Sequence, residues 1–211
     1  MEIHEKPAGM KIFLDLDGTL IDSKERLYRL FQHLVPASTF SYAEYWDYKH
    51  NKIGHREILK NIFSFSDEAI AEFQKKWMDE IEKPQWLALD KPFEGVTSHL
   101  VELKKQHELY LVTARQFENI VLLQLHNFGW TGLFTGVFVT AQKMEKMDLI
   151  KDTIAVAATD WFVGDTGKDI QTGKSLGLKT AAVLSGFLNK EKLLEYEPDM
   201  IVENVINLDF K

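Results

Sequence analysis

The sequence predicts an α/β protein whose core is a Rossmann-like, three-layer α/β/α arrangement with a mostly parallel sheet, interrupted by an inserted all-helical cap. Three observations predict this class. Short apolar runs of strand length recur along the chain, stretches with helical spacing of apolar residues separate them, and one long helical stretch follows the first run. Strands and helices in alternation are typical of parallel sheets that helices cover on both faces.

The expected strands are runs of three or four mainly apolar residues, a length that suits a buried strand. Apolar residues at helical spacing lie between these runs, as in Val96, Leu100 and Leu103, and a glycine such as Gly129 or Gly177 often closes the helical stretch. The runs occupy 12–14, 109–112, 137–139, 161–163, 181–184 and, with a weaker pattern, 200–202.

The spacing of the strand ends locates an insertion. Thr113 follows Asp15 by 98 residues, whereas the later strand ends follow one another after 20 to 27 residues. Since one crossover unit takes about 30 residues, roughly 70 residues are surplus after the first strand. We therefore expect a helical cap at 23–87 and a core formed by 1–22 and 88–211.

Apolar stripes support the helical character of the cap. Ser66 is placed to cap the helix with the clearest stripe, and return linkers are expected near Pro84 and Pro92. That stripe consists of Ile70, Phe73, Trp77 and Ile81.

Composition excludes several classes of function. The 211 residues carry 25 Lys and Arg against 32 Asp and Glu, a net charge of −7, and no cysteine. The absence of cysteine excludes disulfides, thiol catalysis and cysteine-ligated metals. The negative charge disfavours a nucleic acid polymer or an anionic membrane as partner, and no apolar run approaches the ~18 residues of a membrane span. We expect a cytoplasmic protein, monomeric or homodimeric, that binds a small molecule.

An oxygen-bearing side chain follows each major strand. Asp15, Thr113, Thr140, Asp165 and Ser185 occupy these positions. Ligands of open α/β sheets bind beyond the carboxyl ends of the strands, so the oxygens are expected to meet there. Acids that converge without compensation repel one another, and a hard divalent cation such as Mg²⁺ resolves this, often together with a substrate phosphate.

Two segments supply the acids. The first strand exits as Asp15-Leu16-Asp17-Gly18-Thr19, and the fourth as Gly164-Asp165-Thr166-Gly167-Lys168-Asp169. With the hydroxyl of Thr113 and an ammonium from Lys143 or Lys146, they provide what phosphoryl transfer through an aspartyl-phosphate needs.

These motifs resemble those of the haloacid dehalogenase superfamily. The resemblance covers 15–20 (DLDGTL), 111–115 (LVTAR), a lysine before a helix, and Gly164, Asp165 and Asp169 in 164–169, with a cap inserted between the first two motifs. The stretch 164–187 is particularly similar to the phosphoglycolate-phosphatase-like branch. The resemblance implies a Mg²⁺-dependent phosphatase that acts on a small phosphorylated metabolite.

The resemblance also implies roles for individual residues. Asp15 would be the nucleophile and a metal ligand. Asp17 would be the general acid and base, and its backbone carbonyl would bind the metal. Thr113 and the amides of Ala114 and Gly18 would bind the phosphoryl oxygens.

The remaining roles concern the metal and the lysine. Asp165 would ligate Mg²⁺ directly or through water, and Asp169 would hold a metal-bound water or orient its neighbours. Lys146, which directly precedes a helical pattern, is preferred over Lys143 as the catalytic lysine. The alternative is that both lysines are solvated.

Three further cations are candidate substrate ligands. Arg115 directly follows the Thr113-Ala114 pair, although a surface ion pair is an equal alternative for it. Lys49 and Arg56 lie in a cation-rich part of the cap and would meet an anionic end of the substrate, unless they belong to an exposed helix end.

Other functions remain open on the sequence. A phosphomutase of the same fold would depend on a bisphosphate activator, and a 5′-nucleotidase would prefer nucleotides. A non-catalytic protein that binds a phosphorylated ligand would be expected to lack a catalytic acid, whereas both Asp15 and Asp17 are present.

Overall fold

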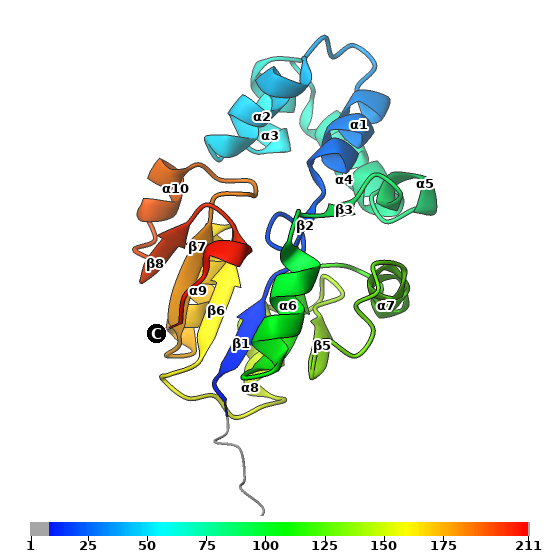
Figure 1. Ribbon diagram of the computed structural model, residues 1–211. Helices are drawn as coiled ribbons and strands as arrows, with labels where there is room; N and C mark the ends of the chain where they lie inside the picture. Colours follow the sequence, from blue (N-terminus) through cyan, green and yellow to red (C-terminus); the bar gives the residue numbers. More distant parts are fainter. Residues whose placement is uncertain (1–8, 211) are drawn as a thin grey trace, which may run out of the picture.

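The computed structural model describes residues 9–210, which form a sheet covered by helices and a separate group of helices at one end (Figure 1). The strands are β1 (Lys11–Leu14), β2 (Ile21–Asp22), β3 (Lys91–Pro92), β4 (Glu108–Thr113), β5 (Gly136–Val139), β6 (Trp161–Gly164), β7 (Lys179–Val183) and β8 (Met200–Val202). The helices are α1 (Lys24–Leu34), α2 (Tyr42–His50), α3 (His55–Asn61), α4 (Asp67–Glu80), α5 (Pro84–Leu87), α6 (Val96–Lys104), α7 (Glu118–Asn127), α8 (Lys146–Lys151), α9 (Gly167–Ser175), α10 (Lys190–Leu194) and the 3₁₀ turn η1 (Val205–Asn207).

The main sheet has six strands in the order β5-β4-β1-β6-β7-β8, and every pairing in it is parallel. The central strand β1 pairs Phe13 with Tyr110 of β4 on one side and with Phe162 of β6 on the other. Because its strands run the same way, their carboxyl ends lie at one edge of the sheet, which is where the inserted helices sit (Figure 1).

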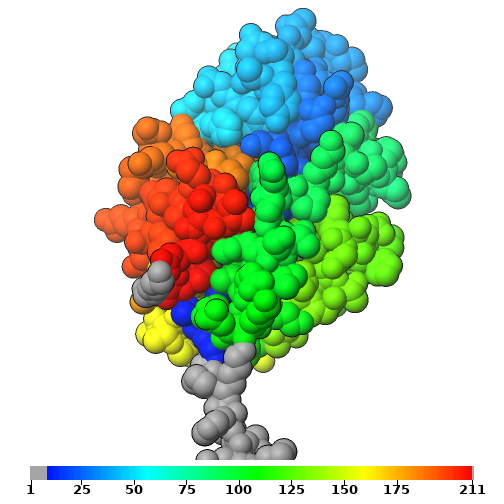
Figure 2. Space-filling view, in the orientation of Figure 1, coloured from blue at the N-terminus to red at the C-terminus, as the bar shows by residue number. Residues whose placement is uncertain are grey.

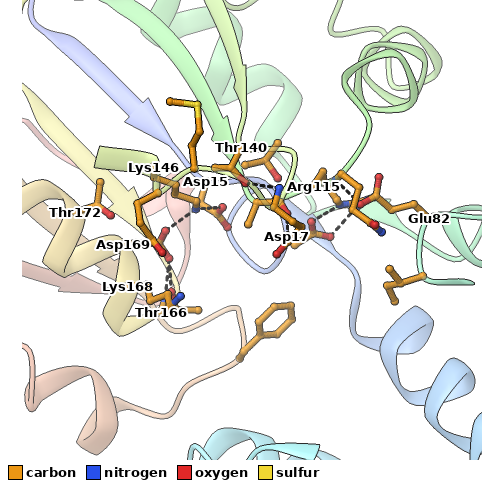
Figure 3. A pocket seen from close by; sticks show the side chains of 18 of the residues that line it. Asp15, Asp17, Glu82, Arg115, Thr140, Lys146, Thr166, Lys168, Asp169 and Thr172 are labelled. Atoms are coloured by element: carbon orange, nitrogen blue, oxygen red, sulfur yellow. Dashed lines mark hydrogen bonds and ion pairs between the residues drawn. The ribbon is translucent and has the colours of Figure 1, made fainter. Parts of the chain in front are cut away.

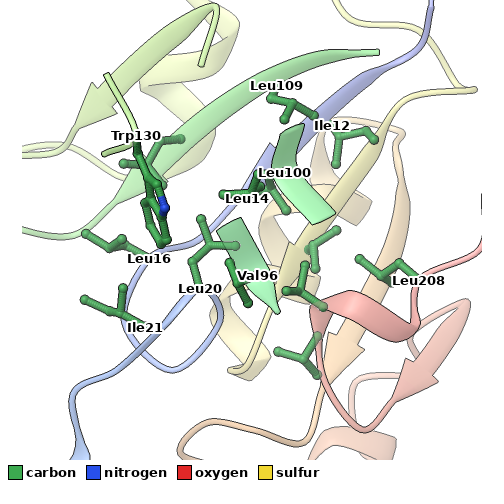
Figure 4. Close-up of a cluster of buried hydrophobic side chains, with 14 of the residues drawn as sticks. Ile12, Leu14, Leu16, Leu20, Ile21, Val96, Leu100, Leu109, Trp130 and Leu208 are labelled. Atoms are coloured by element: carbon green, nitrogen blue, oxygen red, sulfur yellow. The ribbon is translucent and has the colours of Figure 1, made fainter. Parts of the chain in front are cut away.

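Side chains that alternate along β1 supply two apolar layers. Ile12 and Leu14 are fully buried on the face that α6, α7 and η1 cover, together with Leu100 and Trp130 (Figure 4). Phe13 is fully buried in the other layer, against α8 and the strands beside it. Burial on both faces accounts for the continuous apolar strands and confirms the predicted three-layer α/β class.

The inserted helices, α1 to α5, lie between β2 and β3 and form a lobe of their own (Figure 2). Their aromatic core is built around the fully buried Phe31 and Tyr45. Ser66 caps α4 as predicted, because its hydroxyl accepts a hydrogen bond from the Ala69 amide at 3.2 Å. The expected linker at Pro84 is instead the short helix α5, with proline at its first position, where the ring is tolerated.

The lobe contacts the core at several places, among them its two linkers and the end of α2. The antiparallel pair β2 and β3 carries the chain out and back. At the far side, the end of α2 meets the loop after β7, where Asn189 donates its amide hydrogen to the His50 carbonyl at 3.1 Å. The ring of Trp46 also stacks on Phe187, with ring centres 5.5 Å apart.

Within residues 9–210, no helix is both long enough and apolar enough to cross a membrane.

Candidate active site

A cavity of about 690 Å³ lies between the carboxyl ends of the strands and the inserted helices. Four of the five predicted strand-end residues line it, namely Asp15, Thr113, Thr140 and Asp165. The fifth, Ser185, is absent from the lining because its hydroxyl donates to the Gly18 carbonyl at 2.8 Å and so supports the loop beneath. Parallel strands thus bring together side chains that are far apart in the sequence.

Lys146 joins two acids at the floor of this cavity. Its ammonium donates to Asp15 Oδ1 and, at 2.7 Å, to Asp169 Oδ1 (Figure 3). Lys146 is the first residue of α8, so the start of this helix positions its side chain at the cavity. Lys143 is exposed on the cavity wall, so of the two candidate lysines it is Lys146 that contacts the buried acids.

Asp165 is fully buried and incompletely bonded. Its Oδ2 accepts the Phe187 amide at 2.7 Å, whereas its Oδ1 is buried without a hydrogen-bond partner. Two glycines allow this carboxylate to fit, because a Cβ added at Gly18 or Gly186 would lie only 2.3 or 2.0 Å from its Oδ2. Gly18 also has φ +85°, a conformation that other residues rarely adopt.

The acids at the floor suit a divalent cation. One carboxylate oxygen from each of Asp15, Asp165 and Asp169 lies within 4.8 Å of the others. With the ammonium of Lys146 the group carries a formal charge of −2, which Mg²⁺ would balance, and the unpartnered Asp165 Oδ1 is an oxygen that a metal would satisfy.

The pKa values reflect the same crowding. Burial, together with the charges of Asp169 and Asp17, raises the pKa of Asp15 to about 7 in spite of Lys146. Burial and the charges of Asp15 and Asp169 raise the pKa of Asp165 well above its ordinary value. Both carboxyls therefore gain from a nearby cation that favours the ionised form.

Asp17 belongs to a second buried group of charges. Its carboxylate accepts hydrogen bonds from Arg26 and from Arg115, whose Nε lies 2.5 Å from Oδ2. Asp90 forms an ion pair with Arg26, whose Nε lies 2.9 Å from Oδ1, and accepts a hydrogen bond from Arg115 Nη2 at 3.1 Å. Gln124 donates to Asp90 at 2.8 Å. Two guanidinium groups and two carboxylates balance, so this group is neutral without a metal.

This arrangement keeps Asp17 ionised. Burial opposes ionisation, but the charges of Arg115 and Arg26 outweigh it and hold the pKa of Asp17 well below its ordinary value. Figure 3 shows Asp17 pointing toward Arg115 and away from Lys146. The ionised carboxylate is the form that accepts a proton, which is the chemistry of a general base.

Two of the predicted phosphoryl or substrate ligands need correction. The Gly18 amide donates to the Ile21 carbonyl at 2.8 Å and is therefore already engaged; the glycine serves to admit Asp165. Arg115 lines the cavity, but its guanidinium is held by Asp17 and Asp90, so the ion pair is a buried one rather than a contact to substrate. Thr113 and Ala114 do line the cavity.

Lys49 and Arg56 lie outside the lining of this cavity. Arg56 is exposed and forms an ion pair with Asp67 at 2.6 Å, at the start of α4. Lys49 lies on α2, and burial is the main factor that lowers its pKa to about 8. The predicted cap contacts therefore do not form in this structure, because neither residue lines the cavity and Arg56 is paired with Asp67 instead.

Several residues of the site were not foreseen. Arg26 is the one charged side chain among the three buried residues of α1, and Asp90 precedes the return strand β3. Glu82 accepts the amides of Gln116 and Phe117 at 2.7 and 3.4 Å, and so ties the inserted helices to the loop after β4. The signal available in the sequence was an arginine next to the apolar stripe of the first cap helix. Its acidic partners lie far from it along the chain.

Known proteins resemble this chain over nearly its whole length. A model of the family described as haloacid dehalogenase-like hydrolase matches residues 12–183. A phosphoglycolate phosphatase from Aquifex aeolicus (strain VF5) is 26% identical over 209 residues, 93% of either chain. Pyrophosphatase PpaX from Bacillus pumilus (strain SAFR-032) is 24% identical over 207 residues, again 93% of either chain.

The fold is also similar to that of a protein of known structure. A haloacid dehalogenase-like family hydrolase of known structure from Streptococcus pneumoniae superposes with a TM-score of 0.76 at 22% identity, over 92% of this chain and 94% of the other. Together the matches confirm the predicted family, its phosphoglycolate-phosphatase-like branch and the expectation of a phosphatase-type hydrolase. The chain belongs to the haloacid dehalogenase-like hydrolase family.

Proposed function

We propose that this protein is a Mg²⁺-dependent phosphatase that hydrolyses a small phosphomonoester through an aspartyl-phosphate on Asp15. One observation carries the proposal: the Asp15 carboxylate lies in the cavity with Lys146 on one oxygen and two more acids beside it. The names of the relatives, phosphoglycolate phosphatase and pyrophosphatase, support hydrolysis of a bond between phosphorus and oxygen.

In the first step, a carboxylate oxygen of Asp15 attacks phosphorus and the bond between phosphorus and the leaving oxygen breaks. The hydroxyl of Thr113 and the amide of Ala114 donate to the phosphoryl oxygens, where negative charge is concentrated. Lys146 holds Asp15 in place. The leaving oxygen takes a proton, supplied by Asp17 once that carboxyl is protonated and released from its arginines.

The metal would be held by Asp15, Asp165 and the backbone carbonyl of Asp17, with Asp169 orienting Lys146. When bound, Mg²⁺ supplies positive charge to the phosphoryl oxygens and relieves the repulsion between substrate and carboxylates.

In the second step, a water molecule attacks the phosphorus of phospho-Asp15. Asp17, ionised by its two arginines, takes a proton from that water. The bond between phosphorus and the Asp15 oxygen breaks, so the free carboxylate and inorganic phosphate are restored. Asp17 has given up its proton in the first step, so it is ionised when the water attacks, and the proton that it takes from the water restores its acid form.

We assign the role of a cap to the inserted helices, with 23–87 as the cap and 1–22 with 88–211 as the core. Arg26, Glu82 and Trp77 belong to this inserted segment and line the cavity that contains Asp15. A cap that closes over the cavity excludes water and admits small substrates in preference to proteins.

A phosphate-release screen over sugar phosphates, phospho-acids and nucleotides tests the proposal. We expect turnover that needs Mg²⁺ and that falls to background in Asp15→Asn. The matched control is Asp79→Asn, an exposed acid of α4 outside the cavity, which should keep wild-type activity. Undiminished turnover in Asp15→Asn would contradict the mechanism.

A further inference from the structure

The cavity is larger than the substrates named by the relatives require. Its volume of about 690 Å³ falls within the range of about 300–1,000 Å³ that is typical of pockets for drug-sized ligands. Phosphoglycolate and pyrophosphate are much smaller than such ligands. Once a phosphoryl group occupies the floor beside Asp15, space remains toward the inserted helices for a bulky leaving group.

The wall on the side of the inserted helices is apolar. Leu27 of α1, Trp77 and Met78 of α4, and Ile81 at its end line the cavity and are each half-buried. Phe187, from the loop after β7, also lines the cavity. A ligand that covers half-buried apolar side chains removes their exposed surface from water, and this burial favours binding.

The charged side chains that these helices add to the lining are already paired. Arg26 is held by Asp17 and Asp90. Glu82 accepts two backbone amides from the loop after β4. A second anionic group on the substrate would therefore find no free cation on this wall among the described residues.

The lining as a whole is also acidic. Among the described residues that line the cavity, seven are acidic and five are basic. Lys146, Arg26 and Arg115 are bound to carboxylates, whereas Lys143 and Lys168 are exposed and come from the core and not from the inserted helices. A bound Mg²⁺ would bring the formal charge of this lining to zero, so the lining offers no net positive charge for a second anionic group on the substrate.

Resting on the proposed function, we infer that the substrate is a phosphomonoester with an uncharged leaving group that carries a flat apolar part, such as an aromatic ring. The phosphoryl group lies at Asp15 and the ring packs on Trp77 and Ile81. Substrates of the phosphoglycolate or pyrophosphate type, which place a second anion in this space, are poor.

A comparison of benzyl phosphate, ethyl phosphate, phosphoglycolate and pyrophosphate tests this inference. The first two release primary alcohols whose oxygens are of similar basicity, so their difference measures recognition and not leaving-group chemistry. We expect kcat/KM for benzyl phosphate to exceed that for ethyl phosphate and for phosphoglycolate by about tenfold or more. Equal or higher values for phosphoglycolate or pyrophosphate would overturn the inference and leave the phosphatase proposal intact. The absence of phosphate release from every ester would instead overturn the proposed function.

Two variants test whether the apolar wall receives the leaving group. Trp77→Ala should raise KM for benzyl phosphate about tenfold and change kcat/KM for ethyl phosphate less than twofold. The control is Trp86→Ala, a tryptophan of α5 outside the cavity lining, which should leave both substrates unaffected. Since Trp77 also packs on His55, with ring centres 4.3 Å apart, a second variant is needed in case the first misfolds.

Ile81→Lys adds a cation to the apolar wall. It should raise kcat/KM for phosphoglycolate and lower it for benzyl phosphate, about fivefold or more in each direction. Equal losses on both substrates, in a variant with the wild-type melting temperature, would show that this wall does not receive the leaving group.

Discussion

Asp90 is the buried anion that holds the arginines of the general base together. Its side chain is fully buried and contacts Arg26, Arg115 and Gln124. Removal of one partner from a buried ion pair leaves a charge without compensation and costs about 3–5 kcal/mol. We expect Asp90→Asn to lower the free energy of unfolding, measured with urea, by about 3 kcal/mol.

The comparison for this prediction is Asp67→Asn. Asp67 pairs with Arg56 on the surface, and both side chains are more than half exposed. Exposed pairs contribute about 0–1 kcal/mol, so this variant should unfold nearly as the wild type does. If the two variants lose the same stability, the buried network does not hold the fold as described.

The two arginines keep Asp17 in its ionised form, and separate measurement of the two chemical steps tests its role as the base. Aryl phosphates have leaving groups that need no proton, so Asp17→Asn should still form the phosphoenzyme from p-nitrophenyl phosphate. Hydrolysis of that intermediate should slow by about 10²- to 10⁴-fold. Stopped-flow absorbance should therefore record a burst of one nitrophenol per enzyme, followed by slow turnover. A variant that loses the burst along with the steady state would contradict the assignment of Asp17 as the base of the second step.

At the scale of elements, the loop after β7 supports the metal site. Gly186 lies in it, and a Cβ there would come within 2.0 Å of Asp165 Oδ2. Mutation of the groups that position a metal-ligating side chain typically lowers metal affinity by about 10–100-fold. We expect that loss for Mg²⁺ in Gly186→Ala, measured by calorimetry.

Gly54→Ala is the control for this substitution. A Cβ at Gly54 would lie 3.7 Å from its nearest neighbour, Glu57 Oε2, an ordinary contact, and the residue lies outside the cavity lining. Its Mg²⁺ affinity should equal that of the wild type. Unchanged affinity in Gly186→Ala would remove Asp165 from the metal site.

Most elements of the core could be predicted from the sequence. Runs such as 161–163 are apolar throughout because the strand is buried on both faces, and that pattern is local. The stripe of α4 and its cap at Ser66 are local as well. Boundaries were less accurate: the stripe of α4 includes Ile81, whereas the helix ends at Glu80 with Ile81 as its C-cap, because periodicity marks a face but not where hydrogen bonding stops.

At the scale of the whole molecule, pH and Mg²⁺ should act on stability together. The folded protein raises the pKa of Asp15 from 3.8 to about 7, so it binds that proton more tightly than the unfolded chain does. The associated stability is fully present below pH 3.8 and is lost as pH rises through 7. Mg²⁺ competes with the proton for the same oxygens and restores stability above that range.

Thermal unfolding measures this linkage without any assay of activity. The rise in melting temperature on addition of MgCl₂ should be larger at pH 8 than at pH 5.5, relative to NaCl at equal ionic strength. An equal or larger rise at pH 5.5 would mean that the cation does not bind the Asp15 cluster.

The candidate site was predictable only where it follows from strand order. Asp15, Thr113 and Asp165 converge because each follows a parallel strand, and strand ends can be read from the sequence. The partners of Arg26 and Arg115 could not be read in this way, since they depend on how α1 docks above the sheet. For the same reason the charge of Arg56 suggested a contact with substrate that its position on the lobe does not allow.

The central claim is that Asp15 carries the phosphoryl group during turnover. The most direct test is an acid quench of the enzyme during steady-state hydrolysis with Mg²⁺, followed by peptide mapping by mass spectrometry. We predict one phosphoryl group on the peptide that contains Asp15, located on that residue and absent in Asp15→Asn. A quenched enzyme that turns over without a phosphoryl group, or with one on another residue, would contradict the account.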